Sequence, residues 1–137
     1  MNTNNKTGNP DFSMAELALF SETAALKYAV INGYRMIDKN YTCKVGEIGL
    51  ILIKRKTLAF CTIRTLRNGQ PKGPVTEEER RHIRRVASYY LSQGGRLNKL
   101  YHEYDIRFDV IEVNYVGDSF KGAVTHIENA FDGSYPD

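Results

Sequence analysis

Two apolar segments of this chain, at 46–53 and 57–67, carry the polar residues whose types and spacing could do chemistry. Glu47 and Gly49 stand two positions apart in the first segment, as do Thr62 and Arg64 in the second. Because side chains alternate along a strand, the residues of each pair would share one face. An antiparallel hairpin would bring both pairs to its open end. A carboxylate, a hydroxyl and a guanidinium gathered there could form an internal ion pair or a weak cation site.

The local patterns predict the strands that would position these residues. The basic stretch at 54–56 is short enough to be the turn of an antiparallel hairpin. The first three strands are expected at 34–40, 47–53 and 57–64. Glu47, Gly49, Ile51 and Ile53 would then lie on one face of the hairpin, together with Leu58, Phe60, Thr62 and Arg64.

A first helix is expected at 13–32, before the strands. Ser13 and Glu16 have capping-box spacing at its start, and Gly33 is a typical helix stop. Glu22 falls among small apolar residues, where it is either an exposed helical acid or a carboxylate that meets a cation or a donor. One apolar stripe is expected at Leu17, Phe20, Ala24, Tyr28 and Ile31, and a second, nearly opposite, at Leu19, Leu26 and Val30.

A second helix is expected after the polar loop 65–75, because Thr76 and Glu79 form another capping box. Its apolar residues recur at helical spacing, and Gly94 and Gly95 would end it. Arginines occupy its outer face and could contact phosphates, although a solvated charged face is the commoner arrangement. These arginines are Arg81, Arg84 and Arg85, with Arg80 at the margin.

Two further strands are expected at 105–116 and 124–127. Asp109 stands inside the first of them and either closes a salt bridge or belongs to a site. His126 stands in the second without a His or Cys partner at ligand spacing, which favours a simple hydrogen-bonded histidine.

The resulting order αβββαββ indicates an α/β domain with a mixed central sheet flanked by helices. A chain of 137 residues with 42% hydrophobic and 26% charged residues is typical of one soluble globular domain. We expect this domain at 13–131, between a disordered tail at 1–12 and a short tail at 132–137. Cys43 and Cys61 lack the spacing of a disulfide framework or a CxxC site, so a cytoplasmic location is expected, with no membrane span.

Five motifs in shared order resemble the YraN-type family of small bacterial proteins. They are "SETAALKYAVINGYRMIDKNY", "GEIGLI", "EERRHIRRVASYYL", "RFDVIEV" and "HIENAF". That family is grouped with the restriction-endonuclease-like superfamily and is similar to archaeal Holliday-junction resolvases. The resemblance therefore implies a nuclease fold over nearly the whole chain.

The resemblance also implies a magnesium or manganese site that this chain has depleted. The family pattern takes one acid from the first helix, two from "GEIDLI", and an acid and a lysine from "FVEVK". Glu22 and Glu47 match the first two acids, whereas Gly49 and Thr62 replace the other two and Arg64 replaces the lysine. Mg²⁺ needs several hard oxygen ligands, so this replacement predicts that the chain binds no cofactor. If the site is active, the expected cofactor is Mg²⁺ or Mn²⁺.

Three functions remain open from the sequence. The first is a catalytically impaired nuclease homologue that still binds branched or single-stranded DNA. The second is an active metal-dependent endonuclease or junction resolvase, with Asp109 completing a site with Glu22 and Glu47. The third is a protein-interaction module, such as a homodimer, favoured by Tyr89, Tyr90, Tyr101, Tyr104 and Tyr115. The net charge of +3 permits binding to nucleic acid, for which the candidate residues are Lys54, Arg55, Lys56, Arg67, Lys72, Arg81, Arg84 and Arg85.

Overall fold

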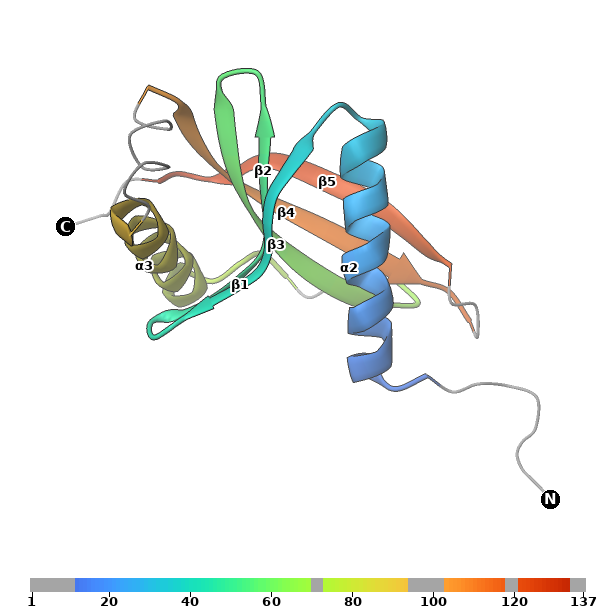
Figure 1. The fold of residues 1–137 in the computed structure, drawn as a ribbon. Helices are drawn as coiled ribbons and strands as arrows, with labels where there is room; N and C mark the ends of the chain where they lie inside the picture. Colours follow the sequence, from blue (N-terminus) through green and yellow to red (C-terminus); the bar gives the residue numbers. More distant parts are fainter. Residues whose placement is uncertain (1–11, 70–72, 94–102, 118–120, 134–137) are drawn as a thin grey trace.

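The computed structural model describes residues 12–69, 73–93, 103–117 and 121–133. They form one five-stranded sheet with the strands in sequence order. Two helices cover its opposite faces (Figure 1). The elements are α2 (Met14–Ile31), β1 (Arg35–Cys43), β2 (Gly46–Lys54), β3 (Thr57–Arg67), α3 (Glu77–Gln93), β4 (Asp105–Tyr115) and β5 (Gly122–Phe131). The predicted order αβββαββ is confirmed.

The sheet is mixed because α3 lies between β3 and β4 in the chain. The connection through this helix makes β3 and β4 parallel, while every other neighbouring pair is antiparallel. The predicted hairpin is confirmed, with Lys54 paired to Thr57 across a tight turn. Arg55 in that turn has a positive φ of 56°.

Both predicted capping boxes are present. The Ser13 and Glu16 side chains exchange hydrogen bonds with each other's backbone at the start of α2. At the start of α3, the Thr76 hydroxyl accepts from the Glu79 amide at 3.1 Å and the Glu79 carboxylate accepts from the Thr76 amide at 2.8 Å. Gly33 follows α2 with φ +88°, which is the left-handed conformation expected of a helix stop. The predicted stop at 94–95 lies outside the described residues.

The first predicted apolar stripe of α2 is wrong in part. Leu17 is buried as expected, but Phe20 and Ile31 are 37% and 83% exposed, and Ser21, Ala25 and Ala29 are the other buried residues. The small side chains let the helix lie close to the sheet, where the Ser21 hydroxyl is 2.9 Å from that of Thr65.

Two core layers lie on the two faces of the sheet. Ile51 and Phe60 face α3, whereas Leu50 and Leu52 face α2. Phe12, in the predicted N-terminal tail, packs edge-on against Phe20 with ring centroids 5.3 Å apart. The predicted tails otherwise fall largely outside the described residues.

Candidate functional site

Four of the five predicted site residues meet at the open end of the β2–β3 hairpin. Glu22 from α2, Glu47 and Gly49 from β2, and Thr62 from β3 line one pocket of about 380 Å³. The capping box of α2 and the hairpin register hold these elements in place. Of the residues that strand spacing predicts to converge there, Glu47, Gly49 and Thr62 line the pocket, whereas Arg64 does not.

The hairpin separates at Gly49. The β2–β3 pairing runs from Lys54 and Thr57 to Leu50 and Cys61. Ile48 packs in the same core layer as Ile51, so the strict alternation that the sequence predicted is interrupted here. A Cβ on Gly49 would lie 3.0 Å from the Ile63 side chain. A larger residue at position 49 therefore requires Ile63 to shift by a few tenths of an ångström.

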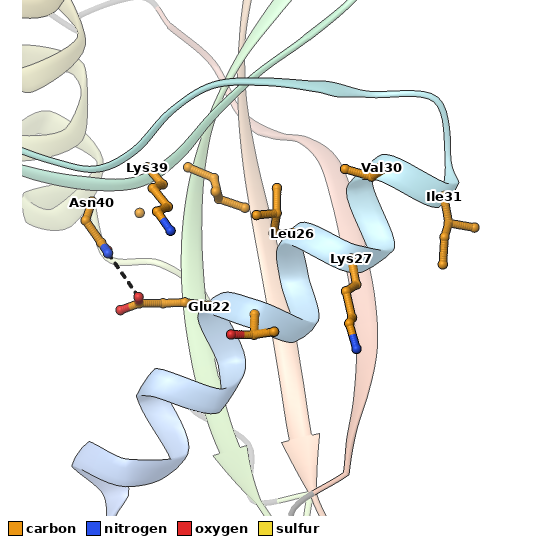
Figure 2. Close-up of a pocket in the computed structure, with 10 residues that line it drawn as sticks. Glu22, Leu26, Lys27, Val30, Ile31, Lys39 and Asn40 are labelled. Carbon is orange, nitrogen blue, oxygen red and sulfur yellow. Dashed lines mark hydrogen bonds between the residues drawn. The ribbon is translucent and has the colours of Figure 1, made fainter.

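Glu22 is satisfied by a neutral donor. Its carboxylate accepts a hydrogen bond of 3.0 Å from the Asn40 side chain, as the dashed line in Figure 2 shows. Of the two readings left open by the sequence, the structure favours a carboxylate that meets a donor. The donor is an amide on β1 and not a cation.

Arg64 is held away from the carboxylates of the pocket. Its guanidinium donates to the Gly73 carbonyl at 2.8 Å and lies 3.9 Å from the Glu112 carboxylate on β4. An internal ion pair of Arg64 with Glu22 or Glu47 is thus not formed in this arrangement. The acidic side of the pocket extends instead toward α3, where Glu78 and Glu79 line a neighbouring pocket that shares Thr62.

A second polar cluster surrounds Asp109, which is completely buried. Arg107 donates to both carboxylate oxygens of Asp109 at 2.8 Å, and the backbone N–H of Asn129 donates to one of them at 2.9 Å. The His126 Nε2 atom lies 2.7 Å from Oδ2. Burial alone would raise the pKa of this carboxyl, but the hydrogen bonds from His126, Arg107 and Asn129 outweigh burial and lower it.

This cluster extends to the surface through Tyr34. The Tyr34 hydroxyl donates to the Glu128 carboxylate and accepts from Arg107 at 2.6 Å. Burial and the bond to Glu128 raise the pKa of Tyr34 to about 12. The cluster thus ties the end of α2 to β4 and β5.

Within the described residues, the one group of three metal-capable side chains is Cys61, Asp109 and His126, whose ligand atoms lie within 4.8 Å of one another. Both oxygens of Asp109 already accept hydrogen bonds, and burial raises the pKa of the Cys61 thiol. The predicted hydrogen-bonded histidine is confirmed. The sequence left Asp109 open between a salt bridge and a site, and the structure shows a salt bridge.

The predicted basic residues do not gather around the pocket. Lys54 is seven residues from Glu47 along β2, or roughly 23 Å. Its ammonium group donates to the Asn32 carbonyl and lies over the Tyr34 ring. Lys56 lies over the Tyr104 ring at the same end of the hairpin. The turn at 54–56 forms the closed end of the hairpin, opposite the end that carries the pocket.

The arginines of α3 do not all lie on its outer face. Arg81 and Arg85 are exposed. Arg84 is only 4% exposed, and it donates to the Asp132 carbonyl and to Glu77. Arg84 is therefore a structural residue and is not accessible to phosphate. Arg67 donates to the Phe12 carbonyl, and Lys72 lies outside the described residues.

Comparison with known proteins places the chain in a family. The model of the uncharacterised protein family UPF0102 matches residues 21–113. This chain belongs to the UPF0102 family. The matched residues include Glu22, Glu47, Gly49, Thr62 and Asp109, and they end before His126.

Relatives in the UPF0102 family span nearly the same length. A UPF0102 protein of Clostridium perfringens (strain 13 / Type A) is 35% identical over 118 residues, covering 84% of this chain and 93% of the relative. One from Alkaliphilus metalliredigens is 38% identical and covers 77% and 88%. One from Legionella pneumophila (strain Corby) is 32% identical and covers 85% and 95%. None of the described helices is long and apolar enough to cross a membrane.

Proposed function

We propose that this chain is a nuclease-fold protein that does not hydrolyse phosphodiesters and that binds nucleic acid. The composition of the pocket at the open end of the β2–β3 hairpin carries this proposal. Its predicted ligand positions hold two carboxylates, Glu22 and Glu47, while Gly49 and Thr62 occupy the other two. The relation to restriction-endonuclease-like enzymes and junction resolvases remains a prediction from the sequence motifs.

The chemistry of the pocket favours loss of hydrolysis. A divalent cation in a nuclease needs anionic oxygens to balance its charge and to fix near-octahedral geometry. Glycine supplies no side-chain ligand, and a threonine hydroxyl is a weak neutral one. Arg64 carries a positive charge but is engaged with Gly73 and Glu112. We therefore expect no ordered Mg²⁺ or Mn²⁺ between Glu22 and Glu47.

An active, rearranged site is disfavoured by the position of Asp109. Asp109 is paired with Cys61 on β3, which is paired with Leu50 on β2. Asp109 therefore lies two strands away from Glu47 across the sheet and three residues away along the strand direction. Each of these separations is roughly 10 Å. Both of its oxygens also accept bonds from the protein. It does not supply the third carboxylate that this alternative requires.

Phosphate contacts would come from outside the pocket, because the pocket is acidic. The turn at 54–56 presents three consecutive basic residues at the far end of the hairpin. The arginines of α3 are a weaker candidate, since Glu77 lies 4.0 Å from Arg80 and from Arg81. We therefore assign the phosphate contacts to Lys54, Arg55 and Lys56.

A cleavage assay tests the loss of hydrolysis. Branched and single-stranded DNA are incubated with the unmodified protein in Mg²⁺ or Mn²⁺, and no cutting is expected. The triple variant Gly49→Asp, Thr62→Glu, Arg64→Lys restores the implied ligands, and we expect it to cut when metal is added. Adding Glu47→Ala to that variant is the matched control. Metal-dependent cutting by the unmodified protein, abolished by Glu47→Ala, would overturn the proposal.

Fluorescence anisotropy with the same DNA tests binding. Replacing all three residues of 54–56 by alanine should lower affinity and reduce the slope of log affinity against log salt by about two to three. Arg81→Ala with Arg85→Ala is the matched control and should have the smaller effect. A protein that binds no nucleic acid at low salt would instead favour the interaction-module reading.

The tyrosine argument for that reading is weakened, because Tyr115 is buried and Tyr90 packs on Phe60.

A further inference from the structure

Two asparagine side chains join the parallel ends of β3 and β4. The backbone N–H of Gly69 donates to the side-chain oxygen of Asn114 at 2.8 Å. The backbone N–H of Gly117 donates to the side-chain oxygen of Asn68 at 2.7 Å. Because both donors are backbone N–H groups, each side chain must present its oxygen and not its NH₂ group. These bonds therefore fix the orientation of both side-chain amides.

The turn at Asn68 and Gly69 has a chemically reactive sequence. Both residues are exposed, and both have the left-handed conformation, with φ 55° and 66°. Asparagine and glycine adopt this conformation more readily than other residues. Glycine also has no side chain that would shield its own nitrogen from a reaction partner. The Gly69 nitrogen can therefore approach the side-chain amide carbon of the preceding residue.

We propose that Asn68 is a site of spontaneous deamidation and that Asn114 slows this reaction in the folded protein. The Gly69 nitrogen attacks Cγ of Asn68, and the bond between Cγ and Nδ2 breaks. The proton lost by the Gly69 nitrogen passes to the leaving group, which departs as ammonia. One water molecule then opens the resulting succinimide ring and leaves aspartate or isoaspartate at position 68. This modification is independent of nucleic-acid binding.

The hydrogen bonds of the turn oppose the first step. The N–H group that must lose its proton is bound to the Asn114 oxygen. The same bond fixes the peptide plane, which must rotate to bring the nitrogen over Cγ of Asn68. Gly117 holds the Asn68 oxygen, and the backbone N–H of Asn68 donates to the Tyr115 carbonyl at 2.6 Å. The reaction therefore requires this end of the sheet to open.

The sequence contains one other asparagine–glycine pair, Asn32 and Gly33. The backbone N–H of Gly33 donates to the Val30 carbonyl at 3.1 Å, and Nδ2 of Asn32 donates to the Tyr28 carbonyl at 2.8 Å. Both acceptors belong to α2, so these bonds do not involve Asn114. Asn32 is therefore an internal control for a change at position 114.

Peptide mass spectrometry tests the proposal on the whole protein after incubation in mildly alkaline buffer. Deamidation is detected by the mass difference between an amide and a carboxylic acid, and isoaspartyl methyltransferase labels the isoaspartate product. We expect deamidation at Asn68, at a lower rate in the folded protein than in guanidinium chloride. Asn114→Ala should raise the rate at Asn68 in the folded protein about three- to tenfold, which is the effect of one net hydrogen bond on a barrier.

Two controls distinguish this effect from a general loss of structure. Asn114→Asp keeps an oxygen acceptor for the Gly69 N–H and should retain the low rate at Asn68. The rate at Asn32 should be the same in the unmodified protein and in both variants. Circular dichroism establishes that each variant is folded.

Three results would overturn the proposal. The first is no deamidation at Asn68 in either the unmodified protein or Asn114→Ala. The second is the same rate at Asn68 in these two proteins. The third is an equal increase at Asn32 and Asn68 in Asn114→Ala, which would indicate unfolding of the variant. The DNA assays play no part in these measurements, so failure of either proposal is recognised independently.

Discussion

Asp109 illustrates how an ion pair and hydrogen bonds stabilise a buried carboxylate. It is 0% exposed, and its charge is compensated by the two-pronged contact of Arg107. The His126 Nε2 atom lies 2.7 Å from the Asp109 carboxylate, and its Nδ1 atom is buried with no partner in the described residues. The cluster is therefore an anchor between β4, β5 and the end of α2.

We predict that Asp109→Asn lowers the free energy of unfolding by about 3–5 kcal/mol, because it leaves the Arg107 charge without its partner. Urea denaturation followed by circular dichroism measures this loss. Glu112→Gln is the control, since its carboxylate is 3.9 Å from Arg64 and 26% exposed. That change should cost less than about 1 kcal/mol. Equal losses for the two variants would contradict the anchoring role.

The same residue predicts an acid dependence of stability. The pKa of Asp109 is lowered in the folded protein, whereas an unfolded aspartate has a pKa of about 3.9. A lowered carboxyl pKa contributes stability above the unfolded value and loses it as the pH falls through the folded value. The free energy of unfolding should therefore decline below about pH 4, and less steeply in Asp109→Asn. Urea titrations at several pH values give the free energy of unfolding as a function of pH for both proteins. If Asp109 made no contribution to the acid dependence, the two pH curves would be parallel.

The β1–β2 turn depends on close approach between elements. Gly46 at the start of β2 has φ +144°, and a Cβ there would lie 2.2 Å from the His82 ring and 2.9 Å from Val86 of α3. This glycine allows α3 to pack against the strand that carries Glu47. The acid of the pocket is thus positioned by the absence of a side chain one residue before it.

We predict that Gly46→Ala lowers the free energy of unfolding by about 2–3 kcal/mol, because backbone strain and a steric clash add together. Gly69→Ala separates the two effects. Gly69 also has a positive φ of 66°, but nothing lies within 4 Å of its missing Cβ. Strain alone should cost about 1–2 kcal/mol there. Thermal unfolding measures both variants, and an equal loss would argue against the contact with α3.

The whole molecule places the pocket of Glu22 and Glu47 at one end of the hairpin and the basic turn at the other. Glu22 and Glu47 are brought together by packing of both helices on the sheet, while the turn at 54–56 closes the opposite end. A nuclease needs phosphate contacts and metal ligands at one place. Their separation here agrees with a protein that binds without cutting.

Metal addition should distinguish the unmodified protein from the restored one. We predict that an excess of Mn²⁺ leaves the melting temperature of the unmodified protein unchanged. Mn²⁺ should raise the melting temperature of the Gly49→Asp, Thr62→Glu, Arg64→Lys variant. A ligand at 100 times its dissociation constant adds about 2.7 kcal/mol to the free energy of unfolding. Differential scanning calorimetry with Ca²⁺ as the comparison ion measures both. A clear Mn²⁺ stabilisation of the unmodified protein would indicate an intact site.

Local patterns in the sequence were sufficient for most of the fold. Capping boxes at Ser13 and Thr76 fixed the helix starts because those hydrogen bonds span only three residues. The hairpin could be predicted because strand spacing and a tight turn determine its register. The family followed from the order of motifs. The nuclease function is not determined by these patterns and stays a proposal.

Only the tertiary structure decided which side chains are buried and which charges meet. Helical spacing could not choose the buried face of α2, since the helix is apolar on nearly all sides and close packing selected Ala25 and Ala29. Arg107 and Asp109 share a strand face, which was the one available signal of their pairing, but His126 arrives from another strand. Arg84 became buried through contact with a distant carbonyl. Contacts between residues far apart in the chain depend on the packing of whole elements, which short-range spacing does not specify.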